Sequence, residues 1–148
     1  MTDHSQAMTA KYRQDYQAPL YWIDSIDLDF QLQEPLTRVT AISRLRRSGE
    51  HNEPLVLDGE GLVLHSVSVD GVPYQQYEQG ESSLTLFNLP AECVLTVVTN
   101  IDPAANTALE GLYKSGDAYC TQCEAEGFRR ITYYLDRPDI LARYSTRI

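Results

Sequence analysis

Apolar and polar residues alternate along much of this chain with the period of two that is typical of β-strands. In the clearest run, the apolar residues share one parity: Ile26, Leu28, Phe30 and Leu32. The residues between them are polar: Asp27, Asp29 and Gln31. The run therefore predicts a strand with one buried face and one hydrated face.

A second alternating run, over residues 37–46, follows a break at Glu34-Pro35. One side of this run carries Val39, Ala41 and Leu45, and the other side carries Arg38, Thr40, Arg44 and Arg46. Ile42 is the exception to the pattern. Two such runs, separated by a short break, predict an antiparallel pair of strands.

Short apolar segments continue along the chain and predict further strands at 54–57, 62–69, 73–77, 83–87 and 93–99. Turn-forming sequences separate them: Asp58-Gly59, Asp70-Gly71, Gln79-Gly80 and Asn88-Leu89-Pro90. Glycine supplies the positive φ that tight hairpin turns require. Many short strands at regular spacing predict an all-β fold, built as an antiparallel β-sandwich.

The carboxyl-terminal region predicts one more strand and one short helix. Residues 131–135, with their paired tyrosines, favour a strand. Asp136-Arg137-Pro138 is typical of a helix start, because Asp caps free amide groups and Pro is tolerated in the first turn. The spacing of Ile140, Leu141 and Tyr144 predicts about two helical turns, over residues 136–144. The last four residues predict the opening of another strand, which favours a chain truncated before further sequence.

The chain has 148 residues, of which 43% are hydrophobic, and one domain of this size buries a core without the help of disulfides. Residues 1–12 are polar and without periodicity, so we expect a flexible amino-terminal segment followed by one domain over residues 13–148. Three cysteines are too few for a disulfide framework, and reduced thiols are expected.

Charge and hydropathy argue against two classes of partner. The formal net charge of -9 would repel the phosphates of a nucleic acid. No stretch approaches the roughly 20 apolar residues that cross a bilayer, and the first residues lack the basic and then apolar pattern of a secretory signal. We therefore expect a cytoplasmic protein that binds neither nucleic acid nor membrane.

Two side chains are candidates for binding chemistry, Gln122 and Glu124. They lie where strand alternation fails, so a polar and irregular loop is predicted, and such loops often carry function. On residue type alone, Glu124 is an ordinary hydrated carboxylate. The neighbouring Cys120 and Cys123 form a Cys-x-x-Cys, but neither a second cysteine pair nor a strand-to-helix pattern accompanies it. Structural thiols are therefore expected there, with a redox role as an alternative.

The run of residues 106–138 is distinctive as a whole: Asn-Thr-Ala-Leu-Glu-Gly-Leu-Tyr, later Cys-Thr-Gln-Cys-Glu-Ala-Glu-Gly-Phe-Arg, and finally Tyr-Tyr-Leu-Asp-Arg-Pro. It resembles the amino-terminal domain of bacterial aminopeptidase N, a family of gluzincin zinc metallopeptidases. Residues 11–19 and 26–30 also resemble the start of that domain. The resemblance implies a saddle-like β-sandwich that rests on a thermolysin-like catalytic domain, within an enzyme that removes amino-terminal residues from peptide substrates.

The resemblance also implies roles for single residues. Glu124 would bind the α-ammonium of the substrate, Gln122 would line the pocket for its first side chain, and a cis peptide is expected near Glu124-Ala125. The family holds its zinc through a His-Glu-x-x-His helix, which this sequence lacks. The histidines also have no metal-site spacing: His4, His51 and His65. Zinc is therefore expected in the complete enzyme and not in this chain, which alone would be inactive.

An alternative is a stand-alone β-sandwich module that uses residues 122–129 to hold peptide amino termini or a protein partner. The two hypotheses differ in gene length. A reading frame that continues to a His-Glu-x-x-His motif would favour the enzyme domain, and a stop codon after Ile148 would favour the module.

Overall fold

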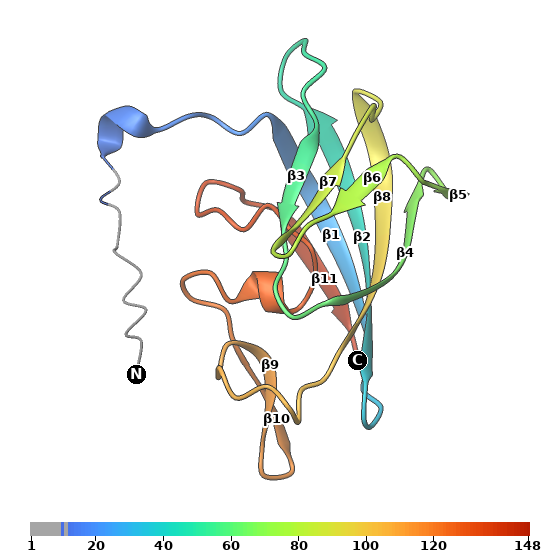
Figure 1. The fold of residues 1–148 in the computed structure, drawn as a ribbon, viewed down its shortest axis with the longest axis vertical. Coiled ribbons are helices and arrows are strands. Elements are labelled where there is room, and N and C mark those ends of the chain that lie inside the picture. Colours follow the sequence, from blue (N-terminus) through green and yellow to red (C-terminus); the bar gives the residue numbers. More distant parts are fainter. Residues whose placement is uncertain (1–9, 11) are drawn as a thin grey trace.

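The computed structural model of the protein describes residue 10 and residues 12–148. These residues form a large and a small sheet that face each other, with a two-stranded ribbon beside them (Figure 1). The large sheet has six strands in the spatial order β11 (Arg143–Arg147), β1 (Tyr21–Gln31), β2 (Thr37–Arg47), β8 (Glu92–Ile101), β4 (Val63–Val69) and β5 (Val72–Pro73). The small sheet has the order β3 (Leu55–Asp58), β7 (Ser83–Leu86) and β6 (Tyr77–Gln79). The ribbon pairs β9 (Gly111–Ser115) with β10 (Ala118–Gln122), and two 3₁₀ turns complete the regular elements, η1 (Arg13–Asp15) and η2 (Phe128–Arg130).

The all-β prediction is confirmed, and the alternation read from the sequence holds for the two longest strands. β1 and β2 form the predicted antiparallel pair, with Leu28 opposite Ala41. β1 begins at Tyr21, however, and a register shift between Ile23 and Ser25 moves the buried parity by one residue. A bulge of this kind lets Tyr21 and Ile23 join the core, although their parity is opposite to that of Leu28.

The shorter predicted strands also form, with small shifts at their ends. The segment predicted at 73–77 divides into two pieces, because β5 joins the large sheet and β6 joins the small one. The chain therefore passes from the large sheet to the small sheet in this segment.

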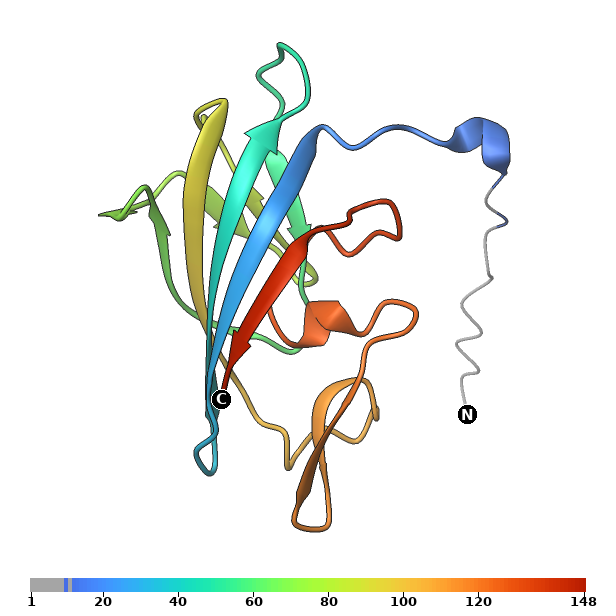
Figure 2. The ribbon, with the colours of Figure 1, turned by 180° about the vertical axis from the view of Figure 1, so that it is seen from behind.

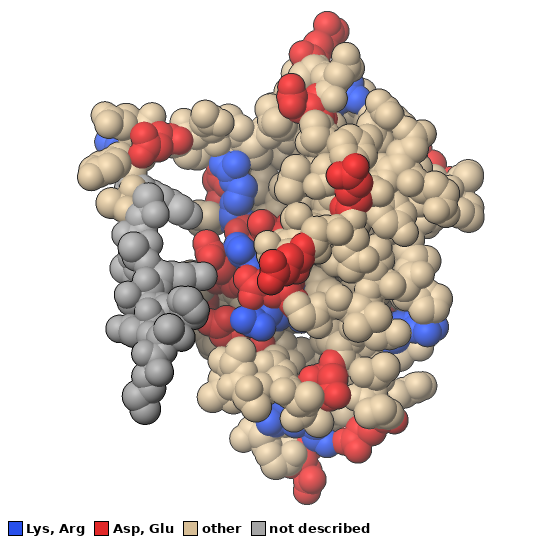
Figure 3. Space-filling view, viewed as in Figure 1, with Lys and Arg blue, Asp and Glu red and all other residues tan. Residues whose placement is uncertain are grey.

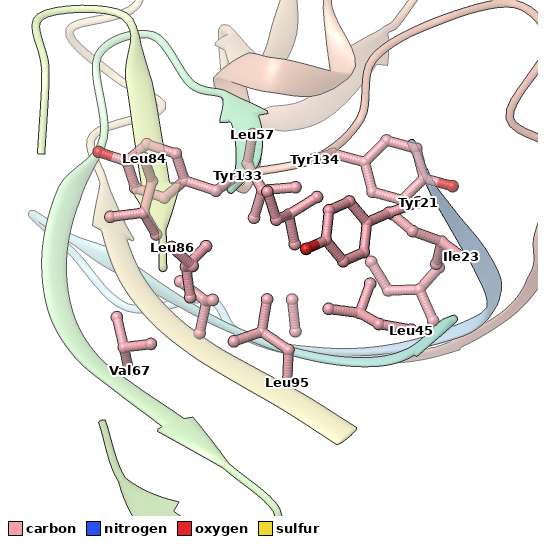
Figure 4. Close-up of a cluster of buried hydrophobic side chains, with 14 of the residues drawn as sticks. Tyr21, Ile23, Leu45, Leu57, Val67, Leu84, Leu86, Leu95, Tyr133 and Tyr134 are labelled. Atoms are coloured by element: carbon pink, nitrogen blue, oxygen red, sulfur yellow. The ribbon is translucent and has the colours of Figure 1, made fainter. Parts of the chain in front are cut away.

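The core lies between the two sheets and is largely aliphatic (Figure 4). Leu84 and Leu86 of β7 are fully buried from the small-sheet side, and Leu95 of β8 faces them from the large sheet. The short strands of the small sheet cover only part of this face. Tyr133 and Tyr134, from the segment that follows η2, are also buried: Tyr134 lies beside Tyr21 of β1, and Tyr133 lies on the side of Leu84 (Figure 4).

The strand predicted at 131–135 is wrong. Tyr133 and Tyr134 are consecutive and both buried, whereas successive side chains of a strand with one hydrated face point to opposite sides. The segment is irregular, and an isolated bridge between Asp58 and Tyr134 links it to the end of β3.

The helix predicted at 136–144 is also wrong. The Asp136 carboxylate does not cap the amides that follow it, because it accepts hydrogen bonds from the backbone N and the Nε of Arg129, at 3.1 and 3.0 Å. From Arg143 the chain is extended and pairs with β1 as the parallel strand β11, seen beside β1 in Figure 2. A short isolated helix is marginal, so this pairing prevails over it. The strand predicted to open at the end of the chain is thus the second half of β11.

Among the described residues, no helix combines the length and the apolarity needed to span a bilayer. Most of the predicted flexible segment, residues 1–12, lies outside the described residues. The domain boundary at residue 13 stays a prediction.

The two faces of β3 provide a test of the sandwich. Leu57 is 2% exposed and lies in the core, while its neighbour Val56 is 49% exposed on the outer face. Leu57→Ala should lower the free energy of unfolding by about 2–5 kcal/mol, because it leaves a cavity between the sheets. The matched control, Val56→Ala, should cost less than about 1 kcal/mol. Urea denaturation of both variants measures the difference, and equal losses would contradict the assignment of the two faces.

Candidate functional site

Gln122 is the last residue of β10, and Glu124 follows it just after the strand. The chain turns back toward η2 after β10 (Figures 1 and 2). Gln122 pairs with Gly111 of β9. A turn over residues 123–127 follows, closed by a hydrogen bond from the backbone N of Gly127 to the carbonyl O of Cys123 at 2.9 Å. The predicted irregular loop is therefore confirmed for Glu124, whereas Gln122 still belongs to the strand.

The two candidate side chains are both exposed and are brought together. The Nε2 of Gln122 donates a hydrogen bond to the carbonyl O of Glu124 at 3.3 Å. The peptide bond between Glu124 and Ala125 is cis, as the resemblance implied. The Glu124 side chain thus extends from a turn whose backbone is tied to Gln122.

Close backbone approach explains why glycine stands at the end of this turn. A Cβ on Gly127 would lie 2.4 Å from the carbonyl O of Gln122, far inside van der Waals contact. Gly111, across the ribbon, has a φ of +71° and would bring a Cβ to 2.7 Å from the Cβ of Arg130. The ends of β9 and β10 and the start of η2 therefore meet at a distance that side chains would prevent.

The two glutamates of the turn have different surroundings. The Oε2 of Glu126 lies 3.6 Å from the Nη2 of Arg129. The Glu124 carboxylate, by contrast, has neither a hydrogen-bond donor nor a basic partner within residue 10 and residues 12–148. Glu124 is consequently the acid of this turn with its charge and its acceptor oxygens available to a ligand.

Arg129, the second residue of η2, holds the carboxyl-terminal side of the turn. Its Nε lies 3.0 Å from the Oδ2 of Asp136, and its Nη1 lies 3.9 Å from the Oδ1 of Asp58. Burial of the guanidinium opposes its charge, but the hydrogen bond to Asp136 and the charges of Asp58 and Glu126 outweigh this, so the pKa of Arg129 is raised. Acidic and basic side chains are interleaved on this side of the molecule (Figure 3).

Arg130 makes a second set of contacts. Its Nη2 lies 2.9 Å from Glu60 in the turn after β3, and its Nε lies 3.3 Å from Glu110 just before β9. These pairs are more exposed than the pair of Arg129 with Asp136, so each is expected to contribute little to stability on its own.

The opposite face of β10 lines an apolar groove of about 460 Å³. Tyr119 and Thr121 of the ribbon face Phe30 and Tyr144 of the large sheet across it. Because strand side chains alternate, Gln122 points to the side of the ribbon away from this groove. Gln122 and the apolar groove therefore lie on different faces of β10.

The cysteines do not form a redox centre of the thioredoxin type. All three are free: Cys93, Cys120 and Cys123. Cys120 lies within β10, and no strand-to-helix turn follows it, as such a centre would require. Burial raises the pKa of Cys123 and raises that of Cys93 to about 11, so both thiols are protonated at neutral pH.

Within the described residues, no group of three or more His, Cys, Asp or Glu side chains is arranged to hold a metal ion. Both ring nitrogens of His51 are engaged, with Nε2 3.0 Å from the carbonyl O of Leu20 and Nδ1 accepting from the backbone N of Glu53 at 3.2 Å. His65 is exposed on β4, and His4 lies outside the described residues. The side chains described thus do not fit a catalytic zinc, which needs three protein ligands.

Comparison with known protein families identifies the family of the chain. Residues 14–148 match the Peptidase M1 N-terminal domain. The chain belongs to this family.

Relatives of the M1 domain are longer proteins. The chain is 55% identical over 144 residues to aminopeptidase N of Escherichia coli, covering 97% of the chain and 17% of that protein. It is 49% identical over 142 residues to aminopeptidase N of Haemophilus influenzae, covering 94% of the chain and 16% of that protein. The chain therefore spans about a sixth of the length of these relatives.

Solved structures agree with the fold of the M1 domain. Aminopeptidase A of Legionella pneumophila, solved in complex with aspartic acid, superposes with a TM-score of 0.84 at 30% identity, covering 92% of the chain and 17% of that protein. An M1 zinc metallopeptidase of Deinococcus radiodurans has a TM-score of 0.70 at 18% identity, covering 85% of the chain and 31% of that protein. The second likeness establishes the fold alone.

Sequence reasoning about the M1 domain missed the ribbon and the Arg129 contacts. The β9 segment, Gly-Leu-Tyr-Lys-Ser, shows no clear alternation, and Leu112 is buried beside an only partly exposed Tyr113. Arg129 and Asp136 are seven residues apart, farther than the three- and four-residue separations at which side chains of one helix contact each other. One usable signal was Gly127, since a glycine that no hairpin requires points to close backbone approach.

Gly127→Ala should disturb the turn of the M1 domain without changing its charge. Gly127 has an ordinary φ of -83°, so the cost is steric and arises at the carbonyl of Gln122. We expect the free energy of unfolding to fall by about 1–3 kcal/mol. Gly80→Ala is the matched control, because its Cβ would meet the Ser83 Oγ at 2.8 Å, and this hydroxyl rotates away. Urea denaturation compares the variants, and unchanged stability of Gly127→Ala would refute the close approach.

Thiol reactivity checks the environment of Cys93. The thiolate is the nucleophile, and the rise in pKa from 9.0 to about 11 lowers its fraction roughly 100-fold near neutral pH. Iodoacetamide should therefore modify Cys93 on the order of 100 times more slowly in the folded chain than in urea. Mass spectrometry of the Cys93 peptide measures both rates. Equal rates would show that this thiol is not buried.

Proposed function

We propose that this chain is the substrate-recognition domain of a zinc-dependent aminopeptidase, in which the Glu124 carboxylate binds the α-ammonium of a peptide. One observation carries the proposal: Glu124 is an exposed acid without a partner among the described residues, on a turn that buried contacts hold in place. Membership of the M1 family supports it, as do relatives that are aminopeptidases.

The chemistry of an exopeptidase explains why a carboxylate is needed. Such an enzyme must select the first peptide bond, and the mark of a peptide's start is its charged ammonium. A hydrogen bond between an ammonium and a carboxylate is shorter and roughly twice as strong as a neutral one. A carboxylate at a fixed distance from the reacting centre therefore decides which peptide bond reaches it.

Gln122 supplies a neutral polar surface beside Glu124. One N–H of its amide donates to the carbonyl O of Glu124, which leaves the other N–H to donate and Oε1 to accept a hydrogen bond. This side chain would contact the first residue of the substrate.

Zinc enters the proposal only through the complete enzyme. The described side chains of this chain do not fit the metal, and none of them is assigned to it. When bound, zinc polarises a carbonyl and activates water for attack. A thermolysin-like catalytic domain in the remaining sequence would hold it, and this chain alone should not hydrolyse an amino-acid anilide. The length of the relatives favours such a partner domain over a stand-alone binding module.

Glu124→Gln in the complete enzyme tests the assignment. The substitution keeps the shape of the side chain and removes its charge. We expect kcat/KM for leucine p-nitroanilide to fall about 30- to 900-fold, equivalent to about 2–4 kcal/mol, as for the loss of a charge-assisted contact. Steady-state kinetics measure the change.

Glu126→Gln is the matched control, because Glu126 is an acid of the same turn whose charge is directed to Arg129. Its kcat/KM should stay within about threefold of the wild type, since exposed ion pairs contribute little. If Glu124→Gln retains full activity, or if Glu126→Gln loses as much, Glu124 does not bind the ammonium.

A further inference from the structure

We infer that Arg129 is a positioning residue for Glu124: it fixes the turn that carries this carboxylate and withholds the neighbouring Glu126 from the ligand. The inference rests on the proposed function of Glu124. Arg129 itself would not touch the substrate, and it acts through the backbone of residues 123–129.

The turn has two ends, and they are held by different means. Its amino-terminal end continues β10, where Gln122 pairs with Gly111 across the ribbon. Its carboxyl-terminal end has no strand pairing. There Arg129 supplies the attachment through its side chain and through its backbone.

The backbone of Arg129 is hydrogen-bonded on both sides. Its N donates to the Oδ2 of Asp136 at 3.1 Å, and its carbonyl O accepts from the backbone N of Glu60 at 3.0 Å. Its side chain adds hydrogen bonds to the same Asp136, from Nε to Oδ2 at 3.0 Å and from Nη2 to the carbonyl O at 3.3 Å. A pair of residues seven apart is thus locked together, and the turn is attached to the segment that covers the core.

Burial makes this attachment more costly to break than an ordinary surface ion pair. The side chains of Arg129 and Asp136 are only 17% and 11% exposed. The backbone N of Asp136 in turn donates to the Oδ2 of Asp58 at 3.2 Å, which brings a second carboxylate close. Removing the guanidinium would leave these two acids near each other and partly buried, and such charges are costly when uncompensated. The segment would then move to hydrate them.

Arg129 also gives the two acids of the turn, Glu124 and Glu126, different roles. It lies 3.6 Å from Glu126 and is not paired with Glu124. With Arg129 present, the turn offers one uncommitted carboxylate. Without Arg129, Glu126 loses its basic partner and becomes a second free acid beside Glu124. An ammonium would then meet two carboxylates on a mobile turn in place of one carboxylate at a fixed position.

The test measures recognition of the ammonium separately from turnover. Leucine hydroxamic acid and 4-methylpentanoic hydroxamic acid share the metal-binding group and the side chain, and only the first carries an α-ammonium. The inhibition constant of 4-methylpentanoic hydroxamic acid divided by that of leucine hydroxamic acid, measured in the complete enzyme, reports the ammonium contact alone. A general loss of folding or of metal would weaken both ligands and leave the ratio unchanged.

We expect Arg129→Gln to reduce this ratio about tenfold, as for residues coupled through a shift of the backbone. Asp136→Asn, which keeps the side-chain shape, should reduce it in the same direction. In the Glu124→Gln background, Arg129→Gln should leave the ratio unchanged, because the group through which it acts is gone. Arg130→Gln is the matched control, since Arg130 is the adjacent cation with two ion pairs of its own, and its ratio should stay within about twofold.

The outcomes separate this inference from the function on which it rests. If Glu124→Gln does not change the ratio, the proposed role of Glu124 fails. If Glu124→Gln lowers the ratio but Arg129→Gln and Asp136→Asn do not, Glu124 keeps its role and the inference about Arg129 fails. An equal loss in Arg130→Gln, or an undiminished effect of Arg129→Gln in the Glu124→Gln background, would overturn it as well. Thermal unfolding of each variant confirms that the proteins compared are folded.

Discussion

The fold depends on how the inner face of the large sheet is covered. The small sheet has strands of three or four residues, and it leaves the part of this face near Tyr21 and Ile23 without a partner strand. Tyr134 covers that part from an irregular segment, and its neighbour Tyr133 is buried on the side of Leu84 (Figure 4). The two buried aromatic rings remove a large apolar area from water. The segment is therefore fixed by the hydrophobic effect, although it has no regular structure of its own. Only η2 separates the turn over residues 123–127 from this segment along the chain, so the position of the turn is tied to the core.

Two further constraints fix the backbone of the turn that carries Glu124. One is steric, because Gly127 and Gly111 allow η2 and the ribbon to meet at backbone distance. The other is electrostatic, because Arg129 joins the end of the turn to Asp136. Neither involves Glu124 itself, and the result is an exposed carboxylate on a well-supported backbone. A backbone held in this way loses little further freedom on binding, which favours affinity for a small charged group.

The parts of this molecule that the sequence predicted are those governed by local alternation. β1 and β2 follow from the parity of their apolar residues, since one face of each strand is buried. The bulge after Ile23 does not follow from it, because the contacts that favour a register shift come from other strands. The helix expected after Asp136 failed for the same reason. Its cap-like carboxylate is used by Arg129, and the segment beyond pairs with a strand made much earlier in the chain. Glu124 was found through a family resemblance, whereas its lack of a partner is visible only when Arg129 and Glu126 are seen in space.

The parallel pairing of β1 with β11 has a consequence for synthesis on the ribosome. Asp29 and Arg147, which form an ion pair across it, are 118 residues apart. One edge of β1 therefore has no partner until almost all of these residues have been translated, and an open strand edge invites pairing with other nascent chains. Asp27 and Asp29 place negative charge along that edge during this interval, which discourages such encounters. β11 thus covers the edge of β1 late in the synthesis of these residues. The carboxylates that protect this edge beforehand include that of Asp29, which later pairs with Arg147.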